Sequence, residues 1–159
     1  MMDSVEDLYQ EVILDHFQNP RCRHCMEDAK TCAHVFNPLC GDEIKVMLSS
    51  DGKHVEDISF LGKGCSISQA SASMMAEICK GKSLEDIREL YTQATSLIKG
   101  SSPGKDYSSL GDIVALGGVR KFPARVKCAV LAWEALGKCL KELESVPADS
   151  TSSSKSTLI

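Results

Sequence analysis

Two stretches of alternating apolar and polar residues, separated by a short turn, constrain the fold of this chain most strongly. EIKVMLS covers residues 43–49, and VEDISFL covers residues 55–61 after the turn segment SSDGK. Successive strand side chains point to opposite faces, so the apolar residues share one face: Ile44, Val46 and Leu48, then Ile58 and Phe60. With a β-like segment at 33–36, they predict a small antiparallel sheet with one buried face.

Helical patterns flank these strands. Asp3 and Ser4 can cap a first helix that ends at Asn19-Pro20. Its apolar stripe is predicted to face the core: Val5, Leu8, Tyr9, Val12, Ile13, His16 and Phe17. We expect His16 to be a packed or surface histidine rather than a ligand.

Three further helices are predicted after the strands. One begins at Ser66 and is stopped by Gly81, with Met74 and Met75 as core filler. The next is capped by Ser83, with Asp86 three residues on. A Gly/Ser/Pro loop at 99–112 precedes a long helix from Pro123, which suits a first helical position, to about Leu143.

Strands followed by helices predict an α+β fold, in which a small three-stranded antiparallel sheet is covered by helices. Residues 1–144 are expected to form one domain, because a chain of 159 residues is the size of one ordinary domain. Residues 145–159 are rich in Ser and Thr and are expected to be a disordered tail.

Composition excludes several classes of protein. The net charge is −4, and only 5% of residues are aromatic, so no basic stripe or base-stacking motif indicates nucleic-acid binding. No apolar run reaches the roughly 18 residues of a membrane span, and the N-terminus lacks the charged-then-apolar order of a signal peptide. These observations predict a cytoplasmic protein that binds neither nucleic acid nor membrane.

The chain has eight cysteines, at 22, 25, 32, 40, 65, 79, 128 and 139. In a reducing cytosol this number favours metal or sulfur chemistry over a disulfide framework. Helical rise separates Cys79 from Cys65 by about 21 Å and Cys139 from Cys128 by about 16 Å, far beyond the roughly 2.3 Å of a zinc–sulfur bond. Cys79 and Cys139 are therefore predicted to be ordinary thiols.

Two cysteines lie where a thiolate is favoured. Cys65 follows two glycines at the predicted start of a helix, whose free N–H groups and dipole favour negative charge. Cys128 lies off the core stripe of the last helix, near Arg125 and Lys127. A small residue packed at a helix start is the alternative explanation for Cys65.

The segment NPLCGDEI, residues 37–44, adds a second type of ligand. Residues i and i+2 of an extended segment point the same way, so Cys40 and Asp42 can approach one metal while Gly41 bends the backbone. Together with Cys65 and Cys128 they form a candidate tetrahedral set for zinc or for iron in a sulfide cluster. Their separation in sequence makes local spacing alone a weak argument.

The motifs NPLCGDEI, FLGKGCSISQASASMM and LGDIVALGGVRKFPARVKCAVLAW closely resemble the SufU branch of the IscU/NifU N-terminal family of iron–sulfur cluster assembly proteins. The N-terminal LYQEVILDHFQNPR matches as well, and the resemblance covers roughly residues 5–143. It implies a SufU/IscU-like fold and metal ligands at Cys40, Asp42, Cys65 and Cys128. Lys127 stands where IscU-type scaffolds carry a histidine, which favours the SufU branch.

The resemblance implies that the chain accepts persulfide sulfur from a SufS-type cysteine desulfurase at a zinc site. We predict that Cys40 is the sulfur acceptor, because it lies on a loop beside a glycine, and that Arg125 supports Asp42 or the persulfide. Downstream partners would be other SUF assembly proteins or apo iron–sulfur proteins. The alternatives are a scaffold that holds a [2Fe–2S] cluster at the same ligands and a purely structural zinc site.

One segment departs from the family pattern. RCRHCMEDAKTCAH, residues 21–34, contains five further potential metal ligands: Cys22, His24, Cys25, Cys32 and His34. They could hold a second zinc, but the segment has no second CxxC knuckle. Incidental thiols are the preferred interpretation.

Overall fold

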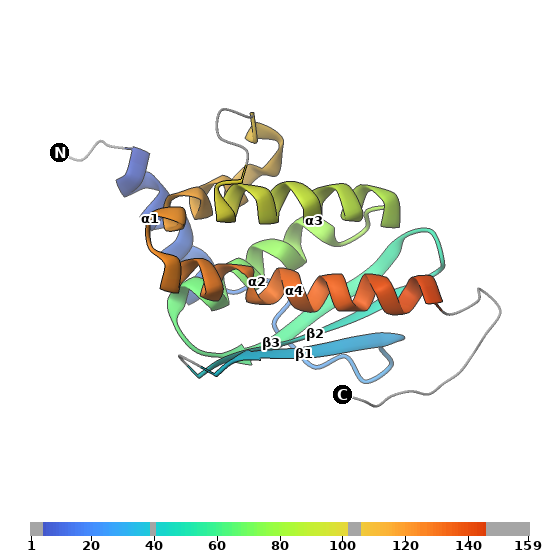
Figure 1. Cartoon of the computed structure of the whole chain (residues 1–159). Coiled ribbons are helices and arrows are strands. Elements are labelled where there is room, and N and C mark those ends of the chain that lie inside the picture. Colours follow the sequence, from blue (N-terminus) through green and yellow to red (C-terminus); the bar gives the residue numbers. More distant parts are fainter. Residues whose placement is uncertain (1–4, 39–40, 102–105, 146–159) are drawn as a thin grey trace.

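The computed structural model describes residues 5–38, 41–101 and 106–145. Its elements are α1 (Val5–Gln18), β1 (Thr31–Asn37), β2 (Asp42–Ser50), β3 (Val55–Lys63), α2 (Ser66–Cys79), α3 (Leu84–Lys99), the 3-10 segment η1 (Ser108–Lys121) and α4 (Pro123–Ser145). Figure 1 shows the sheet as one layer with α2, α3 and α4 stacked on one side of it. This is the predicted α+β architecture. The proposed cap residues Asp3 and Ser4, and residues 146–159 of the expected tail, lie outside the described residues.

The sheet confirms the alternating pattern. Its strand order is β1-β2-β3, and both pairs are antiparallel. Val46 lies opposite Ala33 on one side and Phe60 on the other. The apolar residues of the predicted face are fully buried: Ile44, Val46, Leu48, Ile58 and Phe60. β1 begins at Thr31, two residues before the predicted start of the first β-like segment.

The opposite face of the sheet is partly covered as well, so the expectation of a single buried face is incomplete. Met47 and Ser59 form a cross-strand pair there, and both are buried. The connection after α1 lies against this pair, with the Met26 N–H 3.4 Å from the Met47 sulfur. Residues classed as an irregular polar connection therefore supply a second, smaller apolar contact.

The main core lies between the sheet and helices α2 and α4. Met74, Met75 and Trp133 are buried within it, as expected for core residues. Trp133 Nε1 donates a hydrogen bond of 3.1 Å to Ser71 Oγ, which in turn donates to the Ala129 carbonyl at 2.6 Å. Because each buried polar atom finds a partner, these bonds fix α2 against α4 at little cost in desolvation.

Helix α1 corrects one prediction. Phe17, assigned to the core-facing stripe, is 40% exposed, whereas His16 is fully buried. Val12 and Ile13 are partly buried against the core, as the stripe predicts. A polar ring in a buried position requires hydrogen-bond partners from other elements, and His16 has them.

Segment η1 is a second correction, because residues 108–112 were assigned to a loop. Ser83 does cap α3 by accepting the Asp86 N–H, and α3 ends at Gly100 in the left-handed conformation. Beyond it, four apolar residues of η1 recur every third position and are buried: Leu110, Ile113, Leu116 and Val119. A spacing of three is compatible with the three residues per turn of a 3-10 helix, although Gly111, with φ of 62°, breaks the segment near its start.

No helix in the described part of the chain is both long and apolar enough to cross a membrane.

Candidate metal centre

Three of the four proposed ligands come together at one end of the molecule. Asp42 begins β2, Cys65 directly precedes α2, and Cys128 lies in the second turn of α4. One ligand atom from each lies within 4.8 Å of the other two. In Figure 1 the starts of β2, α2 and α4 meet at the same end of the sheet. The residues are far apart in sequence and are joined only by the tertiary fold.

Strand pairing explains why Asp42 meets Cys65. Glu43 pairs with Lys63 at the last position of the β2–β3 ladder, so the residues after β3 turn past the start of β2. Gly64 makes this turn with φ of +140°, a region that side chains disfavour. A Cβ atom at Gly64 would collide with the Asp42 carboxylate. Only glycine allows this close approach.

The Asp42 carboxylate is buried and well supplied with donors. Its Oδ1 accepts the Cys65 N–H at 3.2 Å, and its Oδ2 lies 3.3 Å from Cys65 Sγ. Burial raises its pKa, but hydrogen bonds from the Cys128 and Cys65 side chains and from the Cys65 backbone outweigh burial and hold the pKa below its usual value. The group is therefore a carboxylate, able to bind a cation, at neutral pH.

The two thiols differ in exposure. Cys65 is exposed and occupies the N-cap position of α2, but its side chain does not cap the helix and instead faces Asp42. Cys128 is only 7% exposed. It was predicted to lie off the core stripe among cations; it is instead buried as part of the hydrophobic core, with Asp42 and Cys65 beside it. One thiol thus faces solvent and the other is held inside.

Two predicted site residues are not placed with this group. Cys40 lies outside the described residues, although Gly41, which follows it, has φ of +78°. Arg125 is exposed, and the structure records no hydrogen bond or ion pair between its side chain and Asp42. Its supporting role stays a prediction.

The donor set fits zinc or iron. Two cysteine sulfurs and one carboxylate oxygen are ligands that tetrahedral zinc accepts, and the sulfurs also suit iron in a cluster. A fourth ligand is required to close a tetrahedral site, and a residue two positions before Asp42 has its Cα within about 7 Å of the Asp42 Cα in any chain. Cys40, two positions before Asp42 in the sequence, stays the predicted fourth ligand.

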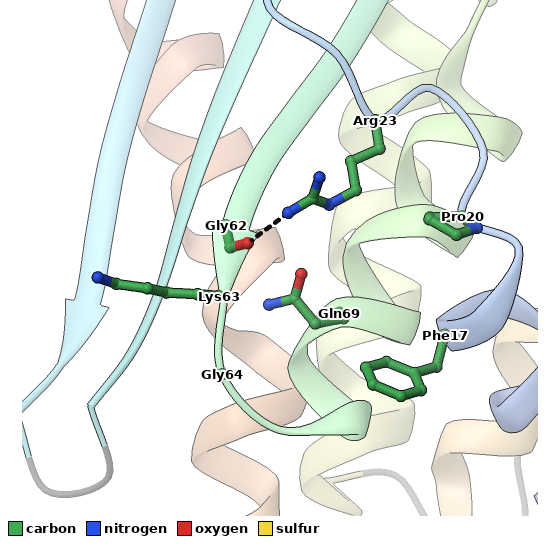
Figure 2. A pocket seen from close by; sticks show the side chains of 7 residues that line it. All are labelled: Phe17, Pro20, Arg23, Gly62, Lys63, Gly64 and Gln69. Atoms are coloured by element: carbon green, nitrogen blue, oxygen red, sulfur yellow. Dashed lines mark hydrogen bonds between the residues drawn. The ribbon is translucent and has the colours of Figure 1, made fainter.

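A hollow of about 260 Å³ adjoins the centre at Gly64. Figure 2 shows the side chains of Arg23, Gln69 and Phe17 on one side of the strand end, whereas the Lys63 side chain points away from them. The Lys63 ammonium pairs with Glu43 at 3.3 Å. Arg23 Nη2 donates a hydrogen bond of 2.9 Å to the Gly62 carbonyl, which fixes its guanidinium near this hollow. Arg23 therefore brings a positive charge to this hollow.

The other described cysteines do not form a site. Cys79 and Cys139 are fully buried, and burial raises the pKa of each thiol to about 12. Within the described residues, no three of the potential ligands in the 21–34 segment come together. The possible second zinc in this segment therefore has no support, and incidental thiols remain the better interpretation.

A second cluster of potential ligands was not predicted. His16, Glu77 and Asp112 bring candidate ligand atoms within 4.8 Å of one another. They come from α1, α2 and η1, and nothing in their sequence neighbourhoods indicates that they meet. Only His16 was singled out, and it was assigned a packing role.

The chain is similar to known proteins over most of its length. The family model described as the NifU-like N-terminal domain matches residues 8–129. A zinc-dependent sulfurtransferase SufU from Bacillus subtilis is 45% identical over 138 residues, covering 85% of this chain and 90% of that protein. An iron–sulfur cluster assembly scaffold protein IscU from Streptococcus pyogenes is 38% identical over 141 residues, covering 88% and 87%.

A solved structure has the same fold. It is a candidate iron–sulfur cluster assembly scaffold protein for the SUF system from Fervidobacterium islandicum, with a TM-score of 0.77 and 32% identity. The match covers 86% of this chain and 99% of that one. The chain therefore belongs to the NifU-like N-terminal domain family, among the SufU- and IscU-type proteins of iron–sulfur cluster assembly.

Proposed function

We propose that this protein is a zinc-bound acceptor of persulfide sulfur that works with a cysteine desulfurase in iron–sulfur cluster assembly. The observation that carries the proposal is that ligand atoms of Asp42, Cys65 and Cys128 lie close together. Cys40 precedes Asp42 by two residues in the sequence. The similarity to a zinc-dependent sulfurtransferase supports zinc as the resting metal. Zinc bound at these residues would keep the cysteines deprotonated at neutral pH.

Cys40 is the proposed acceptor, and the reaction is a thiol–persulfide exchange. The Cys40 thiolate attacks the outer sulfur of a persulfide on the desulfurase, and a new S–S bond forms at Cys40. The S–S bond of the donor breaks, and the desulfurase cysteine leaves as a thiolate. No oxidant or reductant is needed, because one persulfide replaces another.

Position explains why Cys40 rather than Cys65 or Cys128 is the acceptor. Cys65 precedes a helix, and Cys128 is buried inside one, so moving either would disturb α2 or α4. Cys40 is joined to Gly41, whose positive φ is one that glycine adopts without strain. Asp42 would be the exchangeable ligand that lets the site open, and Arg125 would stabilise the anionic persulfide.

The surface around the centre suits a protein partner. Phe36, near the end of β1, is 63% exposed, and Phe122, just before α4, is 55% exposed. Large exposed aromatic side chains are common anchors in protein interfaces. Arg23, which lines the hollow at Gly64, adds positive charge, so we expect the desulfurase to present acidic and apolar groups to this end of the molecule.

The test is the turnover of a SufS-type desulfurase with L-cysteine, measured as sulfide release with and without this protein. Cys40→Ala should abolish the stimulation while the fold, followed by circular dichroism, is retained. Cys32→Ala is the matched control, because Cys32 is an exposed cysteine outside the centre. Full stimulation by the Cys40→Ala protein would refute the proposal, and a folding defect without zinc but no effect on the desulfurase would indicate a structural zinc site.

A scaffold function is the second candidate, favoured by the similarity to IscU proteins named as scaffolds. Here the same ligands would hold a [2Fe–2S] cluster that is passed to apo-proteins. Asp42→Ala should then lengthen the lifetime of the bound cluster, because a labile carboxylate ligand is removed. Metal analysis of protein purified without oxygen separates the two: zinc supports the sulfur acceptor and iron with sulfide supports the scaffold.

A further inference from the structure

The cluster of His16, Glu77 and Asp112 lies outside the proposed sulfur site. His16 Nε2 is 2.9 Å from Asp112 Oδ2 and 3.7 Å from Glu77 Oε1. The histidine side chain is fully buried, whereas both carboxylates are about half exposed. Glu77 lies 12 residues after Cys65, and at 1.5 Å per residue along α2 this is about 18 Å. The cluster is therefore a separate place in the molecule.

The imidazole of His16 is held as a metal ligand would be. Its Nδ1 lies 2.8 Å from Ser73 Oγ, and the same hydroxyl oxygen accepts the Arg21 N–H at 2.9 Å. A hydroxyl oxygen has two lone pairs, so it can accept a bond from Nδ1–H as well. Without an ion, Nε2–H donates to the Asp112 carboxylate while the Ser73 hydroxyl donates to Nδ1. A bound ion would replace the Nε2 proton, and the Nδ1–H bond to Ser73 would then be the outer hydrogen bond typical of metal-binding histidines.

Both carboxylates also border an open space. A hollow of about 170 Å³ is lined by Glu77 and Asp112 together with apolar residues of α2 and η1. It has room for the water molecules that complete the coordination of a divalent ion. Arg21 Nε lies 3.7 Å from Glu77 Oε2, so the arginine pairs with the carboxylate oxygen other than the one nearest His16.

We propose that His16, Glu77 and Asp112 bind a divalent transition-metal ion such as Mn²⁺ or Fe²⁺. One nitrogen and two carboxylate oxygens form a harder donor set than the cysteines of the first centre, so the two sites select different metals. The three ligands lie on α1, α2 and η1, and a bound ion ties these elements together. An ion that binds only the folded chain also stabilises it.

The proposal is tested with Mn²⁺ added to zinc-loaded protein, in which the cysteine centre is occupied. The free Mn²⁺ signal in electron paramagnetic resonance measures binding, and saturable uptake of about one equivalent is expected. Asp112→Asn and Glu77→Gln, both at half-exposed positions, should each weaken binding at least tenfold and remove the Mn²⁺-dependent rise in Tm. Glu134→Gln, an exposed carboxylate on α4, is the matched control and should bind like the original chain.

The decision rests on the carboxylate variants, because replacing the buried His16 could unfold the protein. Zinc content, measured in every sample, should be the same, which separates this result from any failure of the sulfur site. No saturable Mn²⁺ binding by the original chain would overturn the proposal. Binding of equal strength in both carboxylate variants would also overturn it, and the cluster would then be only an ion pair between a histidine and two carboxylates.

Discussion

Helices α2 and α4 each have a cysteine near the start and a second one further along, and the two pairs have opposite surroundings. Cys65 and Cys128 lie near the starts of the helices and share the Asp42 carboxylate. Cys79 and Cys139 lie further along the same helices, fully buried. Burial raises the pKa of both inner thiols to about 12. The Cys139 thiol lies 3.8 Å from the Val46 carbonyl and also contacts the Thr31 side chain.

This difference teaches that position along a helix decides the chemistry of a cysteine. At a helix start, backbone N–H groups are free, and loops from other elements can bring a carboxylate close. On the buried face of a packed helix a polar group needs a hydrogen-bond partner, as Ser71 has, and a thiolate cannot be solvated there. The comparison leads to four predictions, given from the largest expected effect to the smallest.

Alkylation by iodoacetamide should separate the two cysteine pairs most strongly. In metal-free protein at pH 8, Cys79 and Cys139 should react at least about a thousandfold more slowly than exposed thiols, because a pKa of about 12 leaves so little thiolate. Mass spectrometry of peptides after timed labelling measures each rate. Adding urea should make all sites react alike, and fast labelling of Cys79 without urea would contradict the comparison.

Zinc affinity should distinguish the pairs next. Cys65→Ala and Cys128→Ala should each weaken zinc binding at least about 100-fold. Removing only a residue that hydrogen-bonds to a metal ligand already lowers metal affinity by about 10- to 100-fold. Cys139→Ala, in the same helix as Cys128, should change the affinity by less than a few-fold. Competition with a chromophoric chelator measures the constants, and equal losses in all three variants would show that helix packing, not ligation, is responsible.

The glycines at the two ends of α2 provide a third test. Gly64→Ala should lower the free energy of unfolding by about 1–3 kcal/mol, because φ is +140° and the new Cβ would collide with the Asp42 carboxylate. Gly81→Ala also has positive φ, but nothing lies within 4 Å of its Cβ, so it should cost about 1 kcal/mol and spare zinc binding. Urea unfolding of both variants measures the difference. Intact zinc affinity in Gly64→Ala would contradict the role of this turn.

The pH dependence of zinc binding should show the smallest effect. A cysteine that binds zinc loses its proton, so affinity rises with pH, by about tenfold per pH unit for each protonated thiol ligand. The pKa of Asp42 is held low, so this ligand is already ionised and adds no slope between pH 6 and 8. Cys128→Ala should therefore reduce the slope of log affinity against pH by about one, whereas Cys79→Ala should leave it unchanged. Chelator competition at several pH values gives both slopes.

Regular patterns made much of the fold predictable. The strands followed from alternation, and the capping of α3 by Ser83 followed from local sequence, because both depend on near neighbours. Segment η1 was not predicted, because the period of three in Leu110, Ile113, Leu116 and Val119 matches neither an α-helix nor a strand. The cover that Met26 gives to the second face of the sheet has no periodic signal at all.

The candidate metal centre was likewise predictable only in part. Asp42, Cys65 and Cys128 were identified from their local contexts and from the family resemblance, and the structure brings them within 4.8 Å. The burial of Cys128 and the cluster around His16 were not foreseen. Each depends on which elements pack together, and a pattern within one element carries no information about its neighbours.

The sequence by itself determined the order of the strands and main helices, one buried face of the sheet and the candidate ligands Asp42, Cys65 and Cys128, since these follow from chain geometry and side-chain chemistry. Only the tertiary structure decided which thiols lie beside a carboxylate and which are buried in the core. It also decided that His16 lies beside Glu77 and Asp112. The physical reason is that ligation and pKa depend on distances of a few ångströms between segments far apart in the chain. Those distances are set by packing.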